Sequence, residues 1–310
     1  MRTVSNPPGY SVQRQLTILA PLALVMAALF WAGNAVVGRG VIDLIPPMAL
    51  SFWRWVIAFL VILPFALPHL REAAPTLRNN VGKLFVLAFL SAGMFNTILY
   101  LAAHTTTAVN ITLVGATMPI VIGAIGFLIL GTRLSRSQTL GLAIAIPGLL
   151  VIISEGRPST LLELQFRAGD LLMLLAVTSW GLYSVLLQRF GIRLHPVVLL
   201  TAIVALALPV ALTFYTIEWL ILRQGFVLDR SLVLALMYVG VFPSLGAYLG
   251  WNYGVSILGP ARASMFIYLL PVFGAALSIA FLGEHLEIFH GIGALLILIG
   301  LYLSTWVHRR

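Results

Sequence analysis

Residues Ile257 to Ser304 read ILGPARASMFIYLLPVFGAALSIAFLGEHLEIFHGIGALLILIGLYLS, two apolar runs around a short polar turn. A weaker copy of this stretch lies 152 positions earlier, at residues 105–152. The matching positions are mostly proline and glycine: Pro119 with Pro271, Gly131 with Gly283, Gly141 with Gly293 and Gly148 with Gly300. These are the residues whose backbone roles other residues replace least well. The pattern therefore predicts a duplicated helical bundle.

The composition is that of a membrane protein. Hydrophobic residues fill 61% of the 310 positions and charged residues only 9%, whereas a soluble domain carries about 25% charged residues. The net charge of +9 does not indicate nucleic-acid binding, because the basic residues lie in short loops between apolar runs, where they set membrane orientation. Cysteine is absent, which excludes disulfides and thiolate chemistry.

Ten apolar runs approach the roughly 20 residues that cross a hydrocarbon layer of about 30 Å. The predicted spans are 17–37, 48–67, 83–103, 110–130, 137–154, 170–188, 196–222, 231–254, 263–282 and 287–306. The first run is long enough to span, so we interpret it as a transmembrane helix and not as a cleavable signal peptide.

Residues 155–169 form the least apolar interval and divide the chain. We expect an N-terminal five-helix repeat at 1–154, a linker at 155–169 and a C-terminal five-helix repeat at 170–310. An odd number of spans in each half places the second half upside down relative to the first. The predicted fold is an all-α membrane protein with ten transmembrane helices, arranged as two inverted repeats around a central cavity.

The distribution of Lys and Arg predicts the orientation. With the N-terminus in the cytoplasm, the inner loops and ends hold Arg2, Arg14, Arg71, Arg78, Lys83, Arg133, Arg136, Arg189, Arg193, Arg262, Arg309 and Arg310. The outer loops hold only Arg39, Arg157, Arg167, Arg223 and Arg230. This positive-inside bias predicts that both termini are cytoplasmic.

The sequence resembles the EamA-type exporters of the drug/metabolite transporter superfamily over nearly its whole length. The residues that carry the resemblance are FWAGN at 30–34, Arg54 in the second span and the Pro271…FLGE…Gly293…Gly300 pattern of the last two spans. The resemblance implies a secondary transporter in the bacterial inner membrane that exports amino acids, metabolites or toxic compounds. Within the family the chain is similar to bacterial aromatic-amino-acid exporters. It departs from a symmetric pattern at Thr132, which stands where the second half has Glu284.

Polar residues inside the spans are the candidate substrate site, because in hydrocarbon they must face protein or water. Spans one, three, six and eight carry aromatic and polar groups at helical spacing: Trp31 and Asn34, Asn96 and Tyr100, Trp180 and Tyr183, and Tyr248 and Asn252. With Thr112, Ser264 and Tyr268 from spans four and nine, they are predicted to line the central cavity. Rings and amides suit a small zwitterion with an apolar or aromatic side chain. The alternative is interhelical hydrogen bonding, each bond worth roughly 0.6–2 kcal/mol.

Arg54 lies about a turn and a half from the predicted outer end of its span. An arginine near mid-membrane costs at least roughly 2.5–3.5 kcal/mol, which predicts a partner or a wet cavity. Its role would be to hold a substrate carboxylate or an outer gate. The alternative is a side chain that snorkels to the interface.

Other residues favour structural roles. The glycines at 141, 148, 293 and 300 recur every seven residues and predict close packing of spans five and ten. Trp219, Tyr302 and Trp306 near span ends are typical of interface anchors. Glu284 is expected to cap the tenth helix.

The motifs of enzymes and ATP-driven pumps are absent. The single lysine, Lys83, lies outside any phosphate-binding loop, and neither HExxH nor Gly-x-Ser-x-Gly occurs. We therefore expect no catalytic residue, metal site, cofactor or obligatory protein partner; the expected partners are a small-molecule substrate and the lipid bilayer. His104 is the candidate for proton coupling, with exchange or facilitated transport equally open. Drugs, toxic cations, nucleotide sugars and phosphorylated metabolites remain alternative substrates, and a channel or an intramembrane enzyme is a distant alternative.

Overall fold

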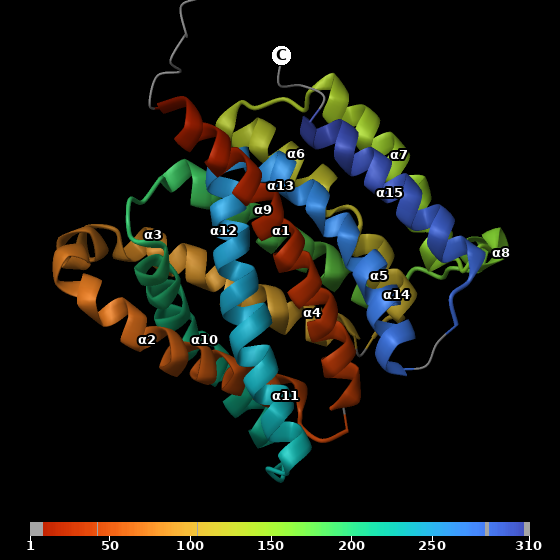
Figure 1. Ribbon diagram of the computed structural model, residues 1–310. Coiled ribbons are helices and arrows are strands. Elements are labelled where there is room, and N and C mark those ends of the chain that lie inside the picture. Colours follow the sequence, from red (N-terminus) through yellow and green to blue (C-terminus); the bar gives the residue numbers. More distant parts are fainter. Residues whose placement is uncertain (1–8, 42, 104, 283–284, 307–310) are drawn as a thin grey trace, which may run out of the picture.

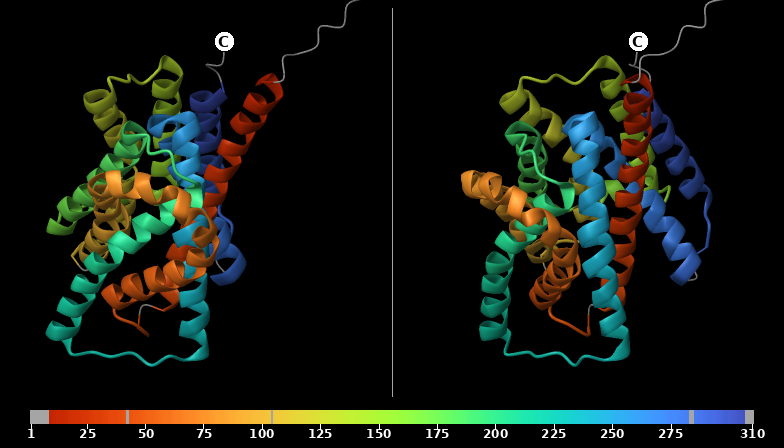
Figure 2. Two further views of the ribbon diagram at one scale, coloured as in Figure 1. Left: turned by 90° about the vertical axis from the view of Figure 1, so that its left-hand side faces the viewer. Right: turned by 60° about the vertical axis from the view of Figure 1, so that its left-hand side comes forward.

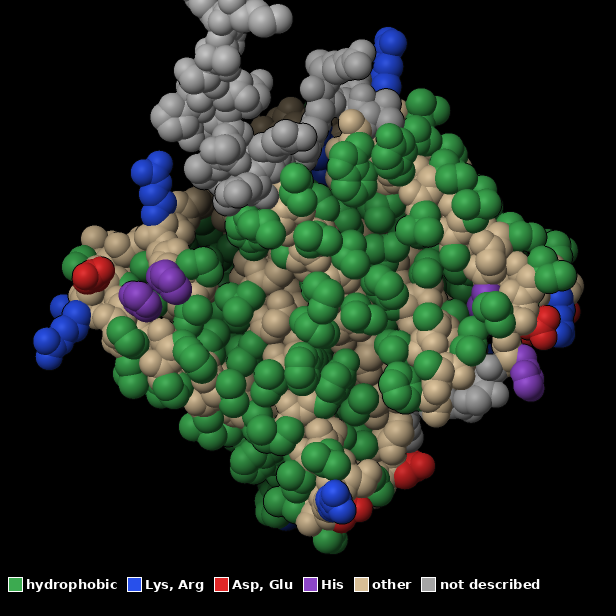
Figure 3. Space-filling view, in the orientation of Figure 1, with side chains coloured by type: hydrophobic (Ala, Val, Ile, Leu, Met, Phe, Trp, Pro, Cys, Tyr) green, Lys and Arg blue, Asp and Glu red, His purple; other side chains and the backbone are tan. Residues whose placement is uncertain are grey.

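The computed structural model of the chain describes residues 9–41, 43–103, 105–282 and 285–306 (Figure 1). These residues form helices and connecting loops without a β-strand. Within these described residues, ten segments are long and apolar enough to cross a membrane, which confirms the predicted ten-span fold. In the space-filling view, hydrophobic side chains cover most of the visible face and charged side chains lie near its edges (Figure 3).

Six spans are single helices: α1 (Gly9–Gly40), α2 (Pro47–Asn79), α7 (Arg136–Ile153), α9 (Ala168–Phe190), α10 (Pro196–Leu222) and α15 (Ile288–Trp306). The third span joins α3 (Val81–Ala88), the π-helix η1 (Phe89–Phe95) and α4 (Asn96–Ala103); the fourth joins α5 (Ala108–Gly115) and α6 (Met118–Leu130). The eighth span joins α11 (Arg230–Val241), the π-helix η2 (Phe242–Gly246) and α12 (Ala247–Leu258). The ninth joins α13 (Pro260–Ser264), the 3-10 helix η3 (Met265–Tyr268) and α14 (Leu269–Leu282), and a short helix, α8 (Pro158–Leu162), lies in the predicted linker.

The second span is predicted to end at residue 67, but the helix that forms it is longer. The helix α2 continues to Asn79 and contains Pro64, Pro68 and Pro75. Hydropathy marks where the apolar run stops, and here the helix continues through more polar residues such as Arg71. The polar end of α2 therefore extends beyond the apolar run.

Helices α7 and α15 lie side by side along one edge of the bundle (Figure 1). A Cβ added to Gly141 would stand 2.5 Å from the carbonyl oxygen of Gly300, and one added to Gly148 would stand 2.7 Å from that of Gly293. Side chains cannot occupy such spaces, so the two backbones meet directly. This confirms the prediction that these glycines let the fifth and tenth spans approach closely.

The glycine contact has the symmetry of the duplication. The 152-residue offset maps Gly141 onto Gly293 and Gly148 onto Gly300, so it turns one contact into the other. An interface whose contacts are exchanged in this way uses the same surface on both halves and is called isologous. The two halves are therefore related by an approximate two-fold rotation.

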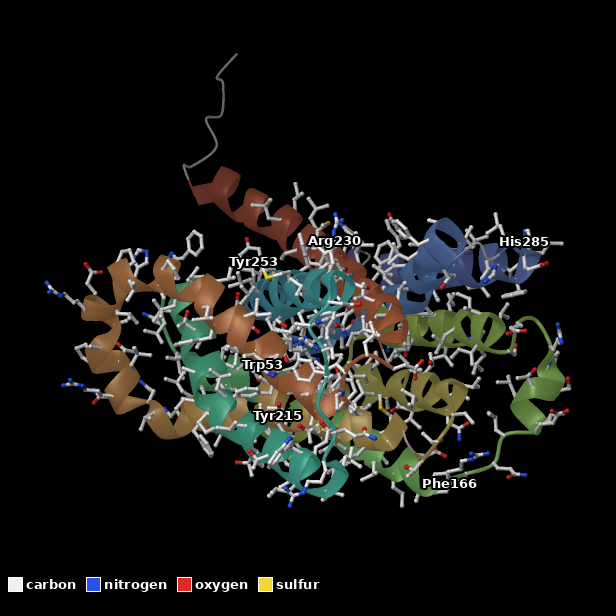
Figure 4. The ribbon with its side chains drawn as sticks, turned by 90° about the horizontal axis from the view of Figure 1, so that it is seen from below. Trp53, Phe166, Tyr215, Arg230, Tyr253 and His285 are labelled. Carbon is white, nitrogen blue, oxygen red and sulfur yellow. The ribbon has the colours of Figure 1, made fainter. Side chains whose placement is uncertain are left out.

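Other contacts between the halves also join equivalent pairs of helices. Helix α1 packs on α12, and the equivalent α9 packs on η1 and α4; α2 packs on α10 (Figure 2). Figure 4 views the bundle from the side opposite to the start of α1 and the end of α15, with Trp53 labelled on α2 and Tyr215 on α10. Helices of each half thus pack directly against helices of the other half.

Candidate functional site

The third and eighth spans are both distorted at matching positions. The π-helix η2 at Phe242–Gly246 corresponds, at the 152-residue offset, to residues 90–94 inside η1 (Phe89–Phe95). π-Helical turns are rare and occur frequently at functional sites. Sequence reasoning missed them, although Gly93, Pro243 and Gly246 are residues that interrupt regular helices.

Each distorted turn accepts a hydrogen bond from the first span of the opposite half. The Ser179 hydroxyl on α9 donates to the carbonyl of Leu90 at 2.7 Å. The Trp31 indole N–H on α1 donates to the carbonyl of Pro243 at 3.2 Å. The two π-helices are therefore both tied across the junction between the halves.

Aromatic rings from both halves meet at this junction, with Trp180 at the centre. Its ring centroid lies 5.4 Å from that of Trp31, 5.1 Å from Tyr183 and 5.4 Å from Tyr248. These four residues come from spans one, six and eight, as predicted for a common site. We call Trp31, Trp180, Tyr183, Tyr248 and Trp251 the aromatic cluster.

Sequence reasoning missed the remaining rings. Trp251 lies 5.5 Å from Trp180, Trp55 lies 5.2 Å from Tyr248, and Phe95 lies 5.1 Å from Trp180, all between ring centroids. Trp55 directly follows Arg54, and Trp251 directly precedes Asn252. Both neighbours were singled out from the sequence. Trp180, Tyr183, Tyr248 and Trp251 are each at most 3% exposed. The rings therefore form a closed packing at the place where the cavity was predicted.

Hydrogen bonds join α9 to α12 beside the rings. The Tyr183 hydroxyl donates to Asn252 Oδ1 at 2.6 Å. The Trp251 indole N–H donates to the Ser184 hydroxyl at 3.2 Å. The predicted interhelical bonding is thus real for Tyr183 and Asn252, and it coexists with their place at the junction.

Arg54 is 2% exposed, so it does not snorkel to a membrane surface. Its Nε donates to the Ser244 hydroxyl at 2.9 Å, and Ser244 belongs to the π-helix η2 of the opposite half. Its guanidinium carbon lies 5.1 Å from the ring centroid of Trp55. The predicted partner of Arg54 therefore exists, but it is a neutral hydroxyl.

The fourth and ninth spans meet at another pair of equivalent positions. The Tyr268 hydroxyl, from η3, donates to the carbonyl of Ala116, between α5 and α6, at 3.0 Å. Pro119 and Pro271, each three residues further on, provide no N–H to the carbonyl four residues earlier. Both spans therefore leave regular α geometry near this contact, as do the discontinuous helices that line sites in many transporters.

The other predicted site residues have different surroundings. Asn96 is 7% exposed and Ser264 is fully buried, with the Ser264 hydroxyl bonded to Ala261 of its own helix. Asn34 and Tyr100 are half-buried. Thr112 is exposed on α5, and its place in the predicted cavity stays a prediction. His104 and Glu284 lie outside the described residues.

The comparisons with known proteins agree with this architecture. The model of the EamA-like transporter family matches residues 18–154 and, a second time, residues 167–306. The chain belongs to the EamA-like transporter family. It is therefore a multi-pass membrane transporter.

Relatives of this EamA-like transporter include "Uncharacterized transporter YyaM" of Bacillus subtilis, 27% identical over 85% of this chain and 86% of that one. A "Probable amino-acid metabolite efflux pump" of Escherichia coli is 24% identical over 95% of this chain and 96% of its own length. One solved crystal structure superposes with a TM-score of 0.76 at 21% identity, covering 94% of this chain and 98% of that protein, which shows the shared fold.

Proposed function

We propose that this EamA-like transporter exports small metabolites, above all neutral and aromatic amino acids, by alternating access between its two inverted halves. The observation that carries the proposal is the aromatic cluster, where rings from both halves converge between two matched π-helices. Transporters built from inverted repeats bind substrate near the midplane between the repeats. The name of the E. coli relative, an amino-acid metabolite efflux pump, agrees with this substrate class.

The closed packing defines what has to move. Trp31 and Tyr183 reach the centre from α1 and α9, whereas Tyr248 reaches it from α12. When spans three, four, eight and nine rock against spans one and six, these rings separate. Their faces then become available to stack on the apolar part of a substrate.

The charges favour exchange or facilitated transport over proton coupling. Proton-driven pumps use a carboxyl group within the membrane that titrates during the cycle. Asp170 is the one buried acidic residue of the described chain, and it lies in the first turn of α9, at a span end. We accordingly propose transport down the substrate gradient, in a cytoplasmic membrane, with both termini on the cytoplasmic side.

Counterflow in proteoliposomes tests this function. Vesicles preloaded with unlabelled amino acids receive labelled phenylalanine, methionine or threonine outside, with and without a pH gradient. We expect uptake without the gradient, competed by other neutral amino acids. Uptake that requires the gradient would contradict uncoupled exchange, and uptake of none of the three by folded protein would shift the proposal to drugs or phosphorylated metabolites.

A further inference from the structure

The positive charge of Arg54 is buried without a negative partner. Arg54 and Asp170 are the only buried charged side chains among the described residues. The carboxylate of Asp170 accepts bonds from the Thr106 hydroxyl at 2.5 Å and from the Asn110 amide at 2.9 Å, on the loop and helix that follow α4. A third bond comes from the backbone N–H of Arg167 at 2.8 Å. The Asp170 carboxylate is therefore hydrogen-bonded elsewhere in the molecule and does not pair with Arg54.

Glu218 contacts α2, the helix that carries Arg54, but its carboxylate is also occupied by other hydrogen bonds. Its carboxylate accepts bonds from the backbone N–H groups of Met48 and Ala49 at 3.0–3.1 Å. Met48 precedes Arg54 by six residues, which is about 9 Å along a helix. Glu218 thus caps the start of α2 and leaves the guanidinium, which bonds only the neutral Ser244 hydroxyl among the hydrogen bonds of the described residues, without a carboxylate partner.

The groups around Arg54 are hydrogen-bond donors without acceptors. Ser51, Arg54 and Trp55 are spaced three and four residues apart and share one face of α2. The Ser51 hydroxyl and the Trp55 indole N–H are buried and have no hydrogen-bond partner. These side chains are 3% and 0% exposed, and each lacks the partner that buried polar groups nearly always have.

Two further unpartnered groups come from the third and eighth spans. The Tyr248 hydroxyl lies near Arg54 and Tyr100, and the Asn96 side chain is its hydrogen-bonding neighbour. Neither this hydroxyl nor Asn96 Nδ2 has a hydrogen bond of normal geometry, and both side chains are at most 7% exposed. Buried polar groups without a hydrogen bond of normal geometry therefore come from three spans, the second, third and eighth.

A buried cation among unpaired donors is complementary to an anion. Amide and indole N–H groups only donate, hydroxyls can donate, and a carboxylate only accepts. A purely cationic ligand could pair only with the hydroxyl and amide oxygens, would leave the indole and guanidinium N–H groups unpaired, and would add a second positive charge. Building on the proposed function, we propose that Arg54, with Ser51, Trp55, Asn96 and Tyr248, binds the carboxylate of the substrate.

The same geometry places the substrate's apolar part. Tyr248 contacts Trp55 on the Arg54 side and Trp180 in the aromatic cluster, at centroid distances of 5.2 and 5.4 Å. A carboxylate on Arg54 therefore directs an attached ring toward the aromatic cluster. No buried carboxylate of the described chain lies there to receive an ammonium group. The site thus recognises a carboxylate together with an attached ring.

Ligand binding tests this inference without transport. Tryptophan fluorescence of the purified full chain in lipid nanodiscs is titrated with 3-phenylpropionate, which lacks the amine, and with phenethylamine, which lacks the carboxylate. We expect saturable binding of 3-phenylpropionate, with phenethylamine about tenfold to hundredfold weaker because it forfeits a charge-assisted pair. Inorganic phosphate and phenyl phosphate form a third arm, since both are anions that Arg54 could hold.

Variants assign the effect to residues. Arg54→Gln should weaken 3-phenylpropionate binding by a similar factor, Arg54→Lys should restore part of it, and Tyr248→Phe should cost a few-fold. Arg230→Gln is the control, because Arg230 is an exposed arginine at the start of α11 (Figure 4). If Arg54→Gln does not fold, the inference is still tested by comparing 3-phenylpropionate with phenethylamine on the unsubstituted protein. The Tyr248→Phe variant gives a second test.

Each outcome separates this inference from the proposed function. Equal binding of phenethylamine, unchanged affinity in Arg54→Gln, or no binding of 3-phenylpropionate overturns the carboxylate site. Tighter binding of phenyl phosphate than of 3-phenylpropionate overturns it in favour of a phosphate site. Amino-acid counterflow that survives Arg54→Gln leaves the transport function standing without this inference. Carboxylate binding without amino-acid counterflow leaves the inference standing and removes the amino-acid assignment.

Discussion

Tyr268 donates its hydroxyl to the carbonyl of Ala116 at 3.0 Å, and the two residues are equivalent positions of the duplicated sequence, 152 residues apart. A bond between equivalent positions lies close to the pseudo-two-fold axis. It joins the fourth and ninth spans, which we propose move during transport. The contact is therefore a direct link between the moving parts of the two halves.

Removing this hydroxyl should weaken the closed arrangement. Tyr268→Phe is expected to lower the free energy of unfolding by about 0.6–1.7 kcal/mol, the range for interhelical hydrogen bonds in membranes. Reversible denaturation in mixed micelles measures the change. Tyr302→Phe is the matched control, because Tyr302 is 60% exposed. An equal effect of the two substitutions would contradict the assignment.

The glycine contact between α7 and α15 should not tolerate a methyl group. Gly300→Ala would place a Cβ 2.5 Å from the carbonyl oxygen of Gly141, and overpacking of this kind costs typically 1–3 kcal/mol. Gly291→Ala on the same helix meets nothing within 4 Å and should leave stability unchanged or raise it. Thermal unfolding of the two variants in one detergent compares them, and equal melting temperatures would refute the close contact.

The Asp170 carboxylate should stabilise the end of the bundle at which α9 begins. Asp170→Asn weakens its bonds to Thr106, Asn110 and the Arg167 backbone, with an expected loss of about 1.5–3 kcal/mol. Asp43→Asn is the control, since Asp43 is exposed and surface substitutions usually change stability by less than about 0.5 kcal/mol. Chemical denaturation measures both. Equal stability of the two variants would show that the network contributes nothing.

The aromatic cluster should determine transport kinetics. Trp180→Ala removes the ring at the centre of the cluster and should raise the half-saturation concentration for phenylalanine counterflow. It should also cost about 3–5 kcal/mol of stability, so transport is normalised to folded protein. Trp219→Ala is the control, because Trp219 is 45% exposed near the end of α10. Unchanged kinetics in both Trp180→Ala and Tyr100→Ala, two of the residues predicted to line the cavity, would exclude this region as the substrate site.

The sequence predicts the span number, the duplication and the inversion because each depends on composition or on residues with few substitutes. Apolar runs mark the spans, and pairs such as Pro119 and Pro271 mark the repeat. The fold class is accordingly confirmed, whereas the repeat boundaries at 154 and 170 stay predictions. The continuation of α2 past residue 67 could not be predicted, because hydropathy reports the apolar run and not the helix.

The site was predictable in part. Trp31, Trp180, Tyr183 and Tyr248 meet as expected, since helical spacing identified the faces that carry them. Trp251 and Trp55 were missed because each lies one position, and hence about 100° of helical rotation, from a residue that was chosen. Spacing within one helix does not fix how that helix is rotated against its neighbours, so the place of the exposed Thr112 in the candidate site stays a prediction. The π-helices were missed although Gly93, Pro243 and Gly246 are local signals of an interrupted helix, and their hydrogen bonds to the opposite half, such as Ser179 to Leu90, are contacts between distant residues that spacing does not predict.

The self-complementary glycine contact also bears on how such a chain arose. A five-helix ancestor with these two glycines could pair with a second, oppositely inserted copy of itself, because one surface supplied both sides of the contact. Any substitution there would then have altered two places at once. In a single chain that carries both copies this constraint is absent, so the halves can diverge. Asp170 and Arg54 show the result: each is a buried charge in one half, and the other half has no buried counterpart among the described residues.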